Sequence, residues 1–165
     1  MRPKLVFITG APGIGKTEAA RRLFERLENS AWLDGDDVWR MNPFRVDDTT
    51  IALAHSNIES VLRNYLAAGF SYVIFSWVLH QQAIIDRILK GLEGLEYELS
   101  VFTLVSDEGT LLSRLGESAS QGKRELALLR LRQSKQLQTT KIDTSHRQPN
   151  DIVDEIVKMV ERRAR

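Results

Sequence analysis

Short apolar runs alternate along the chain with longer stretches in which apolar residues recur at helical spacing. The first apolar run covers residues 5–8, and Ala20, Leu23, Phe24 and Leu27 then repeat at i, i+3, i+4 and i+7. This spacing is typical of the apolar face of an amphipathic helix. Because the same order of strand and helix continues along the chain, we predict an α/β protein with a parallel sheet covered by helices on both faces.

The same pattern predicts five strands and six helices. Gly69 is expected to end the second helix, and Ser106 is expected to cap the fourth. The strands are predicted at residues 5–9, 31–33, 72–78, 99–105 and 141–143, and the helices at residues 16–28, 48–68, 81–89, 107–115, 123–137 and 150–163.

The turn after the first strand carries a glycine-spaced motif that fits the pattern G-x-x-x-x-G-K-S/T at every fixed position. In such a loop, glycines let successive backbone N–H groups point at phosphate oxygens, and the following helix adds the positive end of its dipole. The lysine reaches the outer phosphates, and the threonine hydroxyl binds Mg²⁺. The sequence therefore predicts a nucleotide-binding site formed by Gly10, Ala11, Pro12, Gly13, Ile14, Gly15, Lys16, Thr17 and Glu18.

Carboxylates follow the second predicted strand, in the stretch Asp34-Gly35-Asp36-Asp37. Ligands of parallel α/β sheets bind at the carboxyl ends of the strands, which is where these acids fall. On an extended stretch Asp34 and Asp36 point to the same side, so we expect them to share a hydrated Mg²⁺ or to divide their roles between the metal and an acceptor hydroxyl. Phosphoryl transfer needs such a carboxylate beside clamped phosphates. The alternative interpretation is a solvated Asp-Gly turn.

The charge balance argues against a polyanionic partner. The 165 residues contain 23 basic and 22 acidic side chains, a net charge of +1, without the basic field expected of a duplex nucleic-acid binder. The chain has no cysteine, which excludes disulfides and thiolate zinc sites. No apolar run approaches the ~20 residues of a membrane span, and the N-terminus lacks a signal-peptide pattern. We expect one cytoplasmic domain, residues 1–165, that acts as a monomer or homodimer on a small molecule.

One segment, residues 116–124, is small, polar and flanked by cationic helical patterns. A plain surface loop is one interpretation. Beside a nucleotide site, we interpret this segment as part of a mobile lid that covers approximately residues 114–132.

Three motifs resemble the small P-loop kinases grouped with adenylylsulfate kinase, gluconate kinase, shikimate kinase and chloramphenicol phosphotransferase, and the resemblance covers essentially the whole chain. It implies the three-layer α/β/α P-loop nucleoside triphosphate hydrolase fold, ATP as the phosphoryl donor and Mg²⁺ as the metal. It also implies that Asp36 faces the acceptor hydroxyl as the base, while Asp34 and Thr17 serve the metal. The motifs are the phosphate loop, Asp34-Gly35-Asp36, and Ile142-Asp143-Thr144-Ser145-His146-Arg147-Gln148-Pro149.

The resemblance also implies roles around the nucleotide. Shikimate-kinase-like proteins place the arginine of D-T-x-x-R-x-P against adenine, which implies that Arg147 stacks on the base and that Pro149 shapes the loop. Arg114 matches the arginine that enters the lid and reaches the nucleotide. Lys123 or Arg124 is a candidate for a second cation.

Two departures from the family pattern affect the site. The lid interior consists of Ser, Ala, Gln and Gly residues, in the run 118–122, where many relatives place another arginine. The third strand ends in Phe75-Ser76-Trp77 without the aspartate found in many P-loop proteins, which assigns more of the metal binding to Thr17 and Asp34. Arg40 and Trp77 are the acceptor-binding candidates, while nucleosides, sugar acids, aminoglycoside-like compounds and other hydroxylated metabolites all stay open as acceptors. A wider pool of neighbours comprises Trp39, Asn42, His55, Asn57, Arg63 and His80.

We therefore predict an ATP-dependent kinase that phosphorylates a hydroxyl group, with Lys16, Asp36 and Arg114 as its catalytic residues. One alternative is a nucleotide-binding regulatory ATPase without phosphotransfer, and another is a nucleic-acid-end kinase. A second carboxylate at the acceptor side argues against the regulator, and the near-neutral charge argues against the nucleic-acid kinase.

Overall fold

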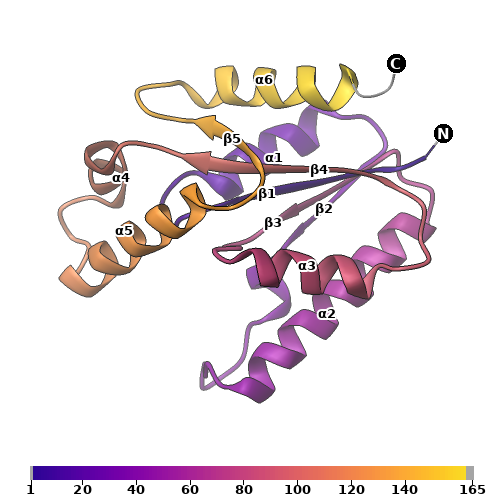
Figure 1. Cartoon of the computed structure of the whole chain (residues 1–165), viewed down its shortest axis with the longest axis horizontal. Helices are drawn as coiled ribbons and strands as arrows, with labels where there is room; N and C mark the ends of the chain where they lie inside the picture. The colour runs from indigo at the N-terminus through magenta and orange to yellow at the C-terminus, as the bar shows by residue number, and fades with distance from the viewer. Residues whose placement is uncertain (1, 163–165) are drawn as a thin grey trace.

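The strand β1 (Lys4–Gly10) lies at the centre of a five-stranded sheet. In the computed structural model, which describes residues 2–162, the strand order is β2-β3-β1-β4-β5 and all neighbouring strands are parallel (Figure 1). The predicted five-stranded parallel sheet is therefore confirmed. The other strands are β2 (Ser30–Asp34), β3 (Tyr72–Ser76), β4 (Glu98–Val105) and β5 (Thr140–Asp143).

Helices cover both faces of the sheet. The helices α1 and α6 lie on one face and α2 and α3 on the other, while α4 and α5 lie toward the end at which β4 finishes (Figure 1). The predicted end of the last helix, Arg163, lies outside the described residues. The bounds are α1 (Lys16–Arg26), α2 (Asp48–Ala67), α3 (Gln82–Gly91), α4 (Glu108–Leu115), α5 (Gln121–Lys135) and α6 (Pro149–Arg162).

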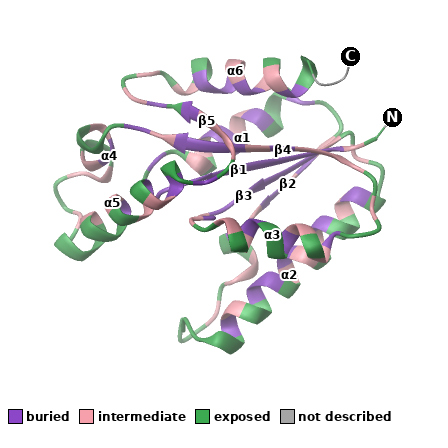
Figure 2. Ribbon diagram, in the orientation of Figure 1, coloured by how far each residue is buried: buried purple, intermediate pink, exposed green. Residues whose placement is uncertain are grey.

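The alternation of side chains along β1 produces two separate hydrophobic cores. Leu5 and Phe7 pack into the core shared with α2 and α3, whereas Val6 and Ile8 pack into the core shared with α1 and α6. All four side chains are completely buried, and the strands are the most buried part of the molecule (Figure 2). A central parallel strand covered on both faces is apolar throughout, which is why residues 5–8 show no polar alternation.

The chain departs from the predicted elements beside β2 and β3. The third strand ends at Ser76, two residues earlier than expected. The extended conformation expected through Asp36 is wrong, because Gly35–Val38 forms a 3-10 helix. The Asp34 side chain caps this turn, its Oδ1 accepting a hydrogen bond of 3.1 Å from the backbone N–H of Asp36. Among residues 2–162, no helix has the length and apolarity to span a bilayer.

Candidate active site

The phosphate loop between β1 and α1 needs glycine at its centre. Gly13 has a φ of +80°, and a Cβ atom there would lie 2.6 Å from the Leu115 side chain. Gly15 has a φ of +104° and caps the N-terminus of α1. The backbone at Gly13 and Gly15 therefore has a left-handed conformation, which favours glycine. The loop also packs against Leu115, at the end of α4.

Lys16 lies under this loop and faces the acidic turn. Its Nζ donates a hydrogen bond of 2.9 Å to the carbonyl oxygen of Ala11. Burial lowers the pKa of Lys16 from 10.5 to about 8, and the nearby carboxylates of Asp36 and Asp34 oppose this lowering. The lysine is thus a partly desolvated cation, and a bound triphosphate would favour its charged form.

Asp34 joins the phosphate loop to the end of β3. Its Oδ2 accepts hydrogen bonds from the Thr17 hydroxyl at 3.1 Å and from the Ser76 hydroxyl at 3.2 Å. The Ser76 hydroxyl in turn accepts a hydrogen bond of 3.0 Å from Nε1 of Trp32. Ser76, at the end of the strand that lacks the aspartate of many P-loop proteins, therefore takes part in this network.

The oxygen atoms of Thr17 and Asp34 fit the preferences of Mg²⁺. Mg²⁺ binds hard oxygen ligands and is usually held by one or two protein side chains together with phosphate oxygens and water. Within residues 2–162, no group of three or more histidine, cysteine or acidic side chains could hold a metal by itself. The donor set is thus that of a metal bound together with a nucleotide.

Trp77 fixes the position of Asp36. The indole Nε1 of Trp77 donates a hydrogen bond of 3.0 Å to Oδ1 of Asp36. The same ring packs on Gly35, where a Cβ atom would lie only 2.4 Å from Cγ of Trp77. The glycine of the Asp34-Gly35-Asp36 motif is thus required by the approach of the indole ring, and Trp77 orients the exposed carboxylate of Asp36.

A groove of about 390 Å³ leads away from Asp36. Arg40, an acceptor-binding candidate, lines it but is paired with Asp37 at 2.5 Å, and its side chain is 78% exposed. The structure therefore brings Asp36 and Trp77 together and leaves Arg40 at the rim. The groove is lined by Asp36, Trp39, Arg40, Met41 and Phe44.

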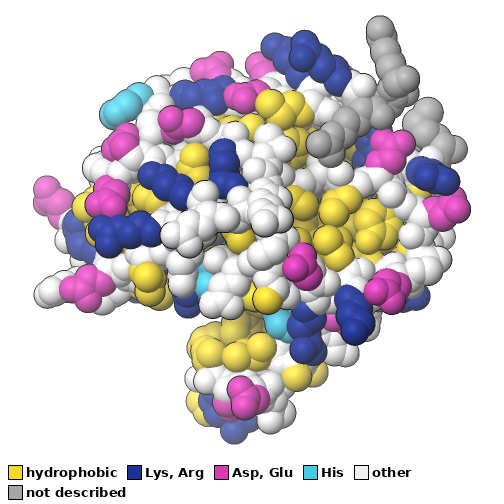
Figure 3. Space-filling view, viewed as in Figure 1, with side chains coloured by type: hydrophobic (Ala, Val, Ile, Leu, Met, Phe, Trp, Pro, Cys, Tyr) yellow, Lys and Arg dark blue, Asp and Glu magenta, His cyan; other side chains and the backbone are white. Residues whose placement is uncertain are grey.

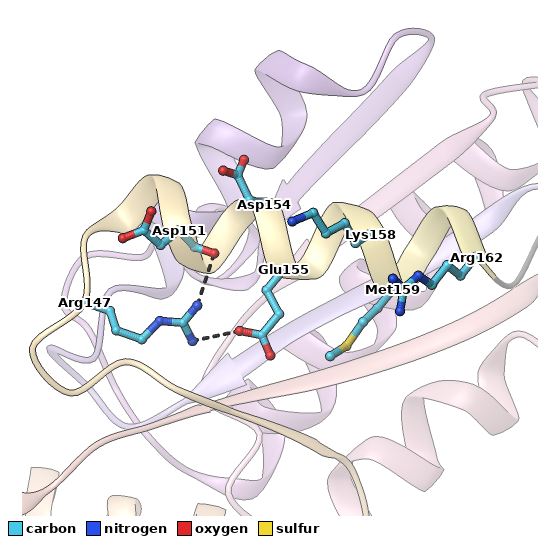
Figure 4. Close-up of a pocket in the computed structure, with 7 residues that line it drawn as sticks. All are labelled: Arg147, Asp151, Asp154, Glu155, Lys158, Met159 and Arg162. Atoms are coloured by element: carbon cyan, nitrogen blue, oxygen red, sulfur yellow. Dashed lines mark hydrogen bonds and ion pairs between the residues drawn. The ribbon is translucent and has the colours of Figure 1, made fainter.

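A second cavity, of about 170 Å³, lies on the other side of the phosphate loop. Arg147 and Pro149, the two residues predicted to lie beside the base, both line it. The Arg147 guanidinium is held at the start of α6 by the Asp143 carbonyl at 2.9 Å. Figure 4, which shows another pocket that Arg147 lines along α6, draws its contacts with the Asp151 carbonyl at 3.2 Å and the Glu155 carboxylate at 2.7 Å. The lining residues are Ile14, Gly15, Glu18, Ala19, Leu104, Arg114, Arg147, Pro149 and Ile152.

Arg114 connects the two loops that enclose this cavity. Its Nη1 donates to the carbonyl oxygen of Ile14 at 3.1 Å and to the Thr144 hydroxyl at 2.8 Å, and its Nη2 donates to the Thr144 carbonyl at 2.6 Å. The guanidinium thus holds the phosphate loop to the segment between β5 and α6. The sequence singled out Thr144 within a motif but not its contact with Arg114, because the two residues lie 30 positions apart and no local pattern links them.

The loop between α4 and α5 is shorter than expected, because α5 begins at Gln121 and not at residue 123. Arg124 donates to the carbonyl oxygens of Gly116 at 2.8 Å and Ala119 at 3.3 Å, so it closes the turn between α4 and α5. Arg124 is therefore occupied within the turn, while Lys123 is exposed.

A family model described as an AAA domain matches residues 5–160. Among curated proteins, none matches the sequence. The tunicamycin resistance protein of Deinococcus radiodurans superposes with a TM-score of 0.78 at 23% identity, over 96% of each chain.

Two kinases superpose nearly as well. A gluconokinase from Sinorhizobium meliloti 1021 gives a TM-score of 0.74 at 16% identity, over 98% of this chain and 93% of that one. The shikimate kinase from Acinetobacter baumannii, solved in complex with shikimate, gives 0.66 at 16% identity, over 98% and 94%. At these identities the likeness concerns the fold, and the predicted three-layer P-loop kinase fold is confirmed.

Proposed function

We propose that this chain, which belongs to the AAA domain family, is an ATP-dependent kinase. It phosphorylates a hydroxyl group of a small molecule. The observation that supports this most is the Trp77–Asp36 hydrogen bond of 3.0 Å, which holds a carboxylate close enough to Lys16 to influence its pKa. A phosphate clamp facing a fixed, solvent-exposed carboxylate is the arrangement that phosphoryl transfer to a hydroxyl requires.

In the proposed reaction, Lys16 binds the outer phosphates of ATP and Asp36 accepts the proton of the acceptor hydroxyl. The acceptor oxygen forms a bond to the γ-phosphorus as the bond from that phosphorus to the β-phosphate oxygen breaks, which gives ADP and a phosphorylated acceptor. Thr17 and Asp34 would hold Mg²⁺, which neutralises phosphate charge when it is bound.

Arg114 and Arg147 are proposed to serve the nucleotide. Arg114 fixes the phosphate loop through its hydrogen bond to Ile14, so it supports the triphosphate site from behind. The turn between α4 and α5 is proposed to close over the nucleotide as a lid and exclude water.

Arg147→Ala is expected to weaken ATP binding about 3–30-fold, because the variant loses a cation stacked on the base. Binding of inorganic tripolyphosphate, which has no base, should change much less. Isothermal titration with both ligands measures the difference. Arg26→Ala is the matched control. Arg26 forms an ion pair with Asp154 of α6, but it does not line the cavity that Arg147 and Pro149 line. Equal losses for the two ligands in Arg147→Ala would contradict the stacking role.

An acceptor panel tests the proposed function. Purified protein is incubated with ATP, Mg²⁺ and one hydroxylated compound at a time, and ADP release is compared with the background without acceptor. We expect at least one acceptor to raise ADP release well above this background. ATP binding with no response to any acceptor would favour the regulatory ATPase over the kinase.

A further inference from the structure

Aromatic rings extend from Asp36 along the groove. The Trp39 ring packs edge-on against Trp77, the partner of Asp36, with ring centroids 5.7 Å apart. On its outer side Trp39 packs edge-on against Phe44, with centroids 5.4 Å apart. A molecule whose hydroxyl reaches Asp36 therefore passes over an aromatic surface.

Further exposed apolar side chains follow Phe44 in the chain. Phe44 is 59% exposed, and Val46 and Leu53, on the following segment and on α2, are 64% and 50% exposed. Figure 3 shows hydrophobic side chains gathered on the projecting lower part of the molecule, where α2 and the segment before it lie. Burying an apolar side chain of this size stabilises a complex by about 1.5–3 kcal/mol relative to leaving it exposed. Covering these side chains with an apolar group would therefore be favourable.

The groove does not offer a free cation to an anionic acceptor. The one cation among its lining residues, Arg40, is paired with Asp37. Arg45, next to Phe44 in the chain, lies 4.0 Å from the carboxylate of Asp47. Carboxylate and phosphate groups are usually bound by unpaired arginine or lysine, so this wall does not favour a sugar acid or a nucleotide.

We infer that the phosphate acceptor is an uncharged molecule that carries its hydroxyl on one part and an aromatic or acyl group on another, with the apolar group lying over Trp39 and Phe44. This inference rests on the proposed kinase function, in which Asp36 receives the hydroxyl. An amphiphilic ligand matches a groove that begins at the Asp36 carboxylate and continues over Trp39 and Phe44.

Three probes related to glucose test this inference: n-hexyl β-D-glucoside, whose alkyl chain stands for the apolar group, uncharged glucose, and the anionic open-chain gluconate. Binding of each is measured by isothermal titration with Mg²⁺ and a non-hydrolysable ATP analogue present. We expect hexyl glucoside to bind at least about tenfold more tightly than glucose or gluconate, from the apolar area that its chain buries. Phe44→Ala should weaken hexyl glucoside binding about tenfold and leave the affinity for the ATP analogue unchanged. Phe24→Ala is the control, because Phe24 is an exposed phenylalanine on α1, 40% exposed, that does not line the groove.

The inference is overturned if gluconate binds more tightly than hexyl glucoside, if hexyl glucoside does not bind, or if Phe44→Ala and Phe24→Ala have the same effect. A protein that phosphorylates gluconate would keep the proposed function and lose this inference. A protein that binds hexyl glucoside through Phe44 but transfers phosphate to no acceptor would lose the proposed function instead. Sedimentation gives one more contradicting result: self-association abolished by Phe44→Ala would assign the apolar surface to a second copy of the chain.

Discussion

Asp36→Asn is expected to lower acceptor-dependent ADP release about 10²–10⁴-fold, the usual contribution of a general base. Asparagine keeps the size of the side chain and an oxygen that can accept the hydrogen bond from Trp77, which is 3.0 Å long in the wild-type protein. The turn should therefore stay intact. What is lost is the group that accepts the proton of the hydroxyl. The affinity for Mg·ATP should barely change, because Asp36 faces the acceptor groove.

Asp34→Asn should behave differently, because Asp34 contacts Thr17 and Ser76 at the proposed metal site. We expect Mg²⁺-dependent nucleotide binding and turnover to fall together in this variant. Asp37→Asn is the matched control: Asp37 lies in the same turn, and its partner is Arg40 at the rim. Full activity in Asp36→Asn would end its role as the base. Loss of Mg·ATP binding in Asp36→Asn but not in Asp34→Asn would show that the two roles are reversed.

Lys16→Met is expected to abolish the thermal stabilisation that Mg·ATP gives to the wild-type protein. A ligand at one hundred times its Kd stabilises the native state by about 2.7 kcal/mol, which corresponds to a rise in Tm of about 5–10 °C for a protein of this size. Thermal unfolding with and without Mg·ATP measures the shift. Lys90→Met, on the exposed end of α3, should keep the full shift. An equal shift in wild type and Lys16→Met would contradict the assignment of the phosphate loop.

The pH dependence of the nucleotide-free protein provides a second measurement on Lys16. The pKa of this lysine is about 8 in the folded protein and 10.5 in the unfolded chain, so the unfolded chain binds more protons between these two pH values. The free energy of unfolding contributed by this group should therefore rise as the pH increases from about 8 to 10.5, and this rise should be absent in Lys16→Met. The comparison of the two proteins removes the contribution of other titrating groups.

Local sequence pattern was sufficient to predict the sheet and the phosphate loop. The continuous apolar run at residues 5–8 and the spacing of Ala20 and Leu23 reflect burial, which acts at each position separately. The glycines of the loop reflect backbone conformations that few other residues adopt, as at Gly13. Such signals are local, so they can be read without the tertiary structure.

The geometry of the acidic turn depended on tertiary contacts and could not be predicted. The alternation of Asp34 and Asp36 suggested extended backbone, yet the packing of Trp77 on Gly35 accompanies a 3-10 turn at that point. Trp77 was predicted to bind the acceptor, and the structure adds a hydrogen bond through which it orients Asp36. Arg114 was expected at the nucleotide, and its contacts with Thr144 depend on a segment 30 residues later in the chain.

The central claim is that this chain transfers a phosphoryl group, and the fate of that group tests it most directly. An acceptor that raises ADP release is incubated with the protein, ATP and Mg²⁺, and the products are quantified by mass spectrometry and a phosphate assay. The account predicts phosphorylated acceptor in the same amount as ADP, with inorganic phosphate at the level of the control without acceptor. Inorganic phosphate equal to the ADP formed, with the acceptor unchanged, would contradict it and identify the protein as an ATPase.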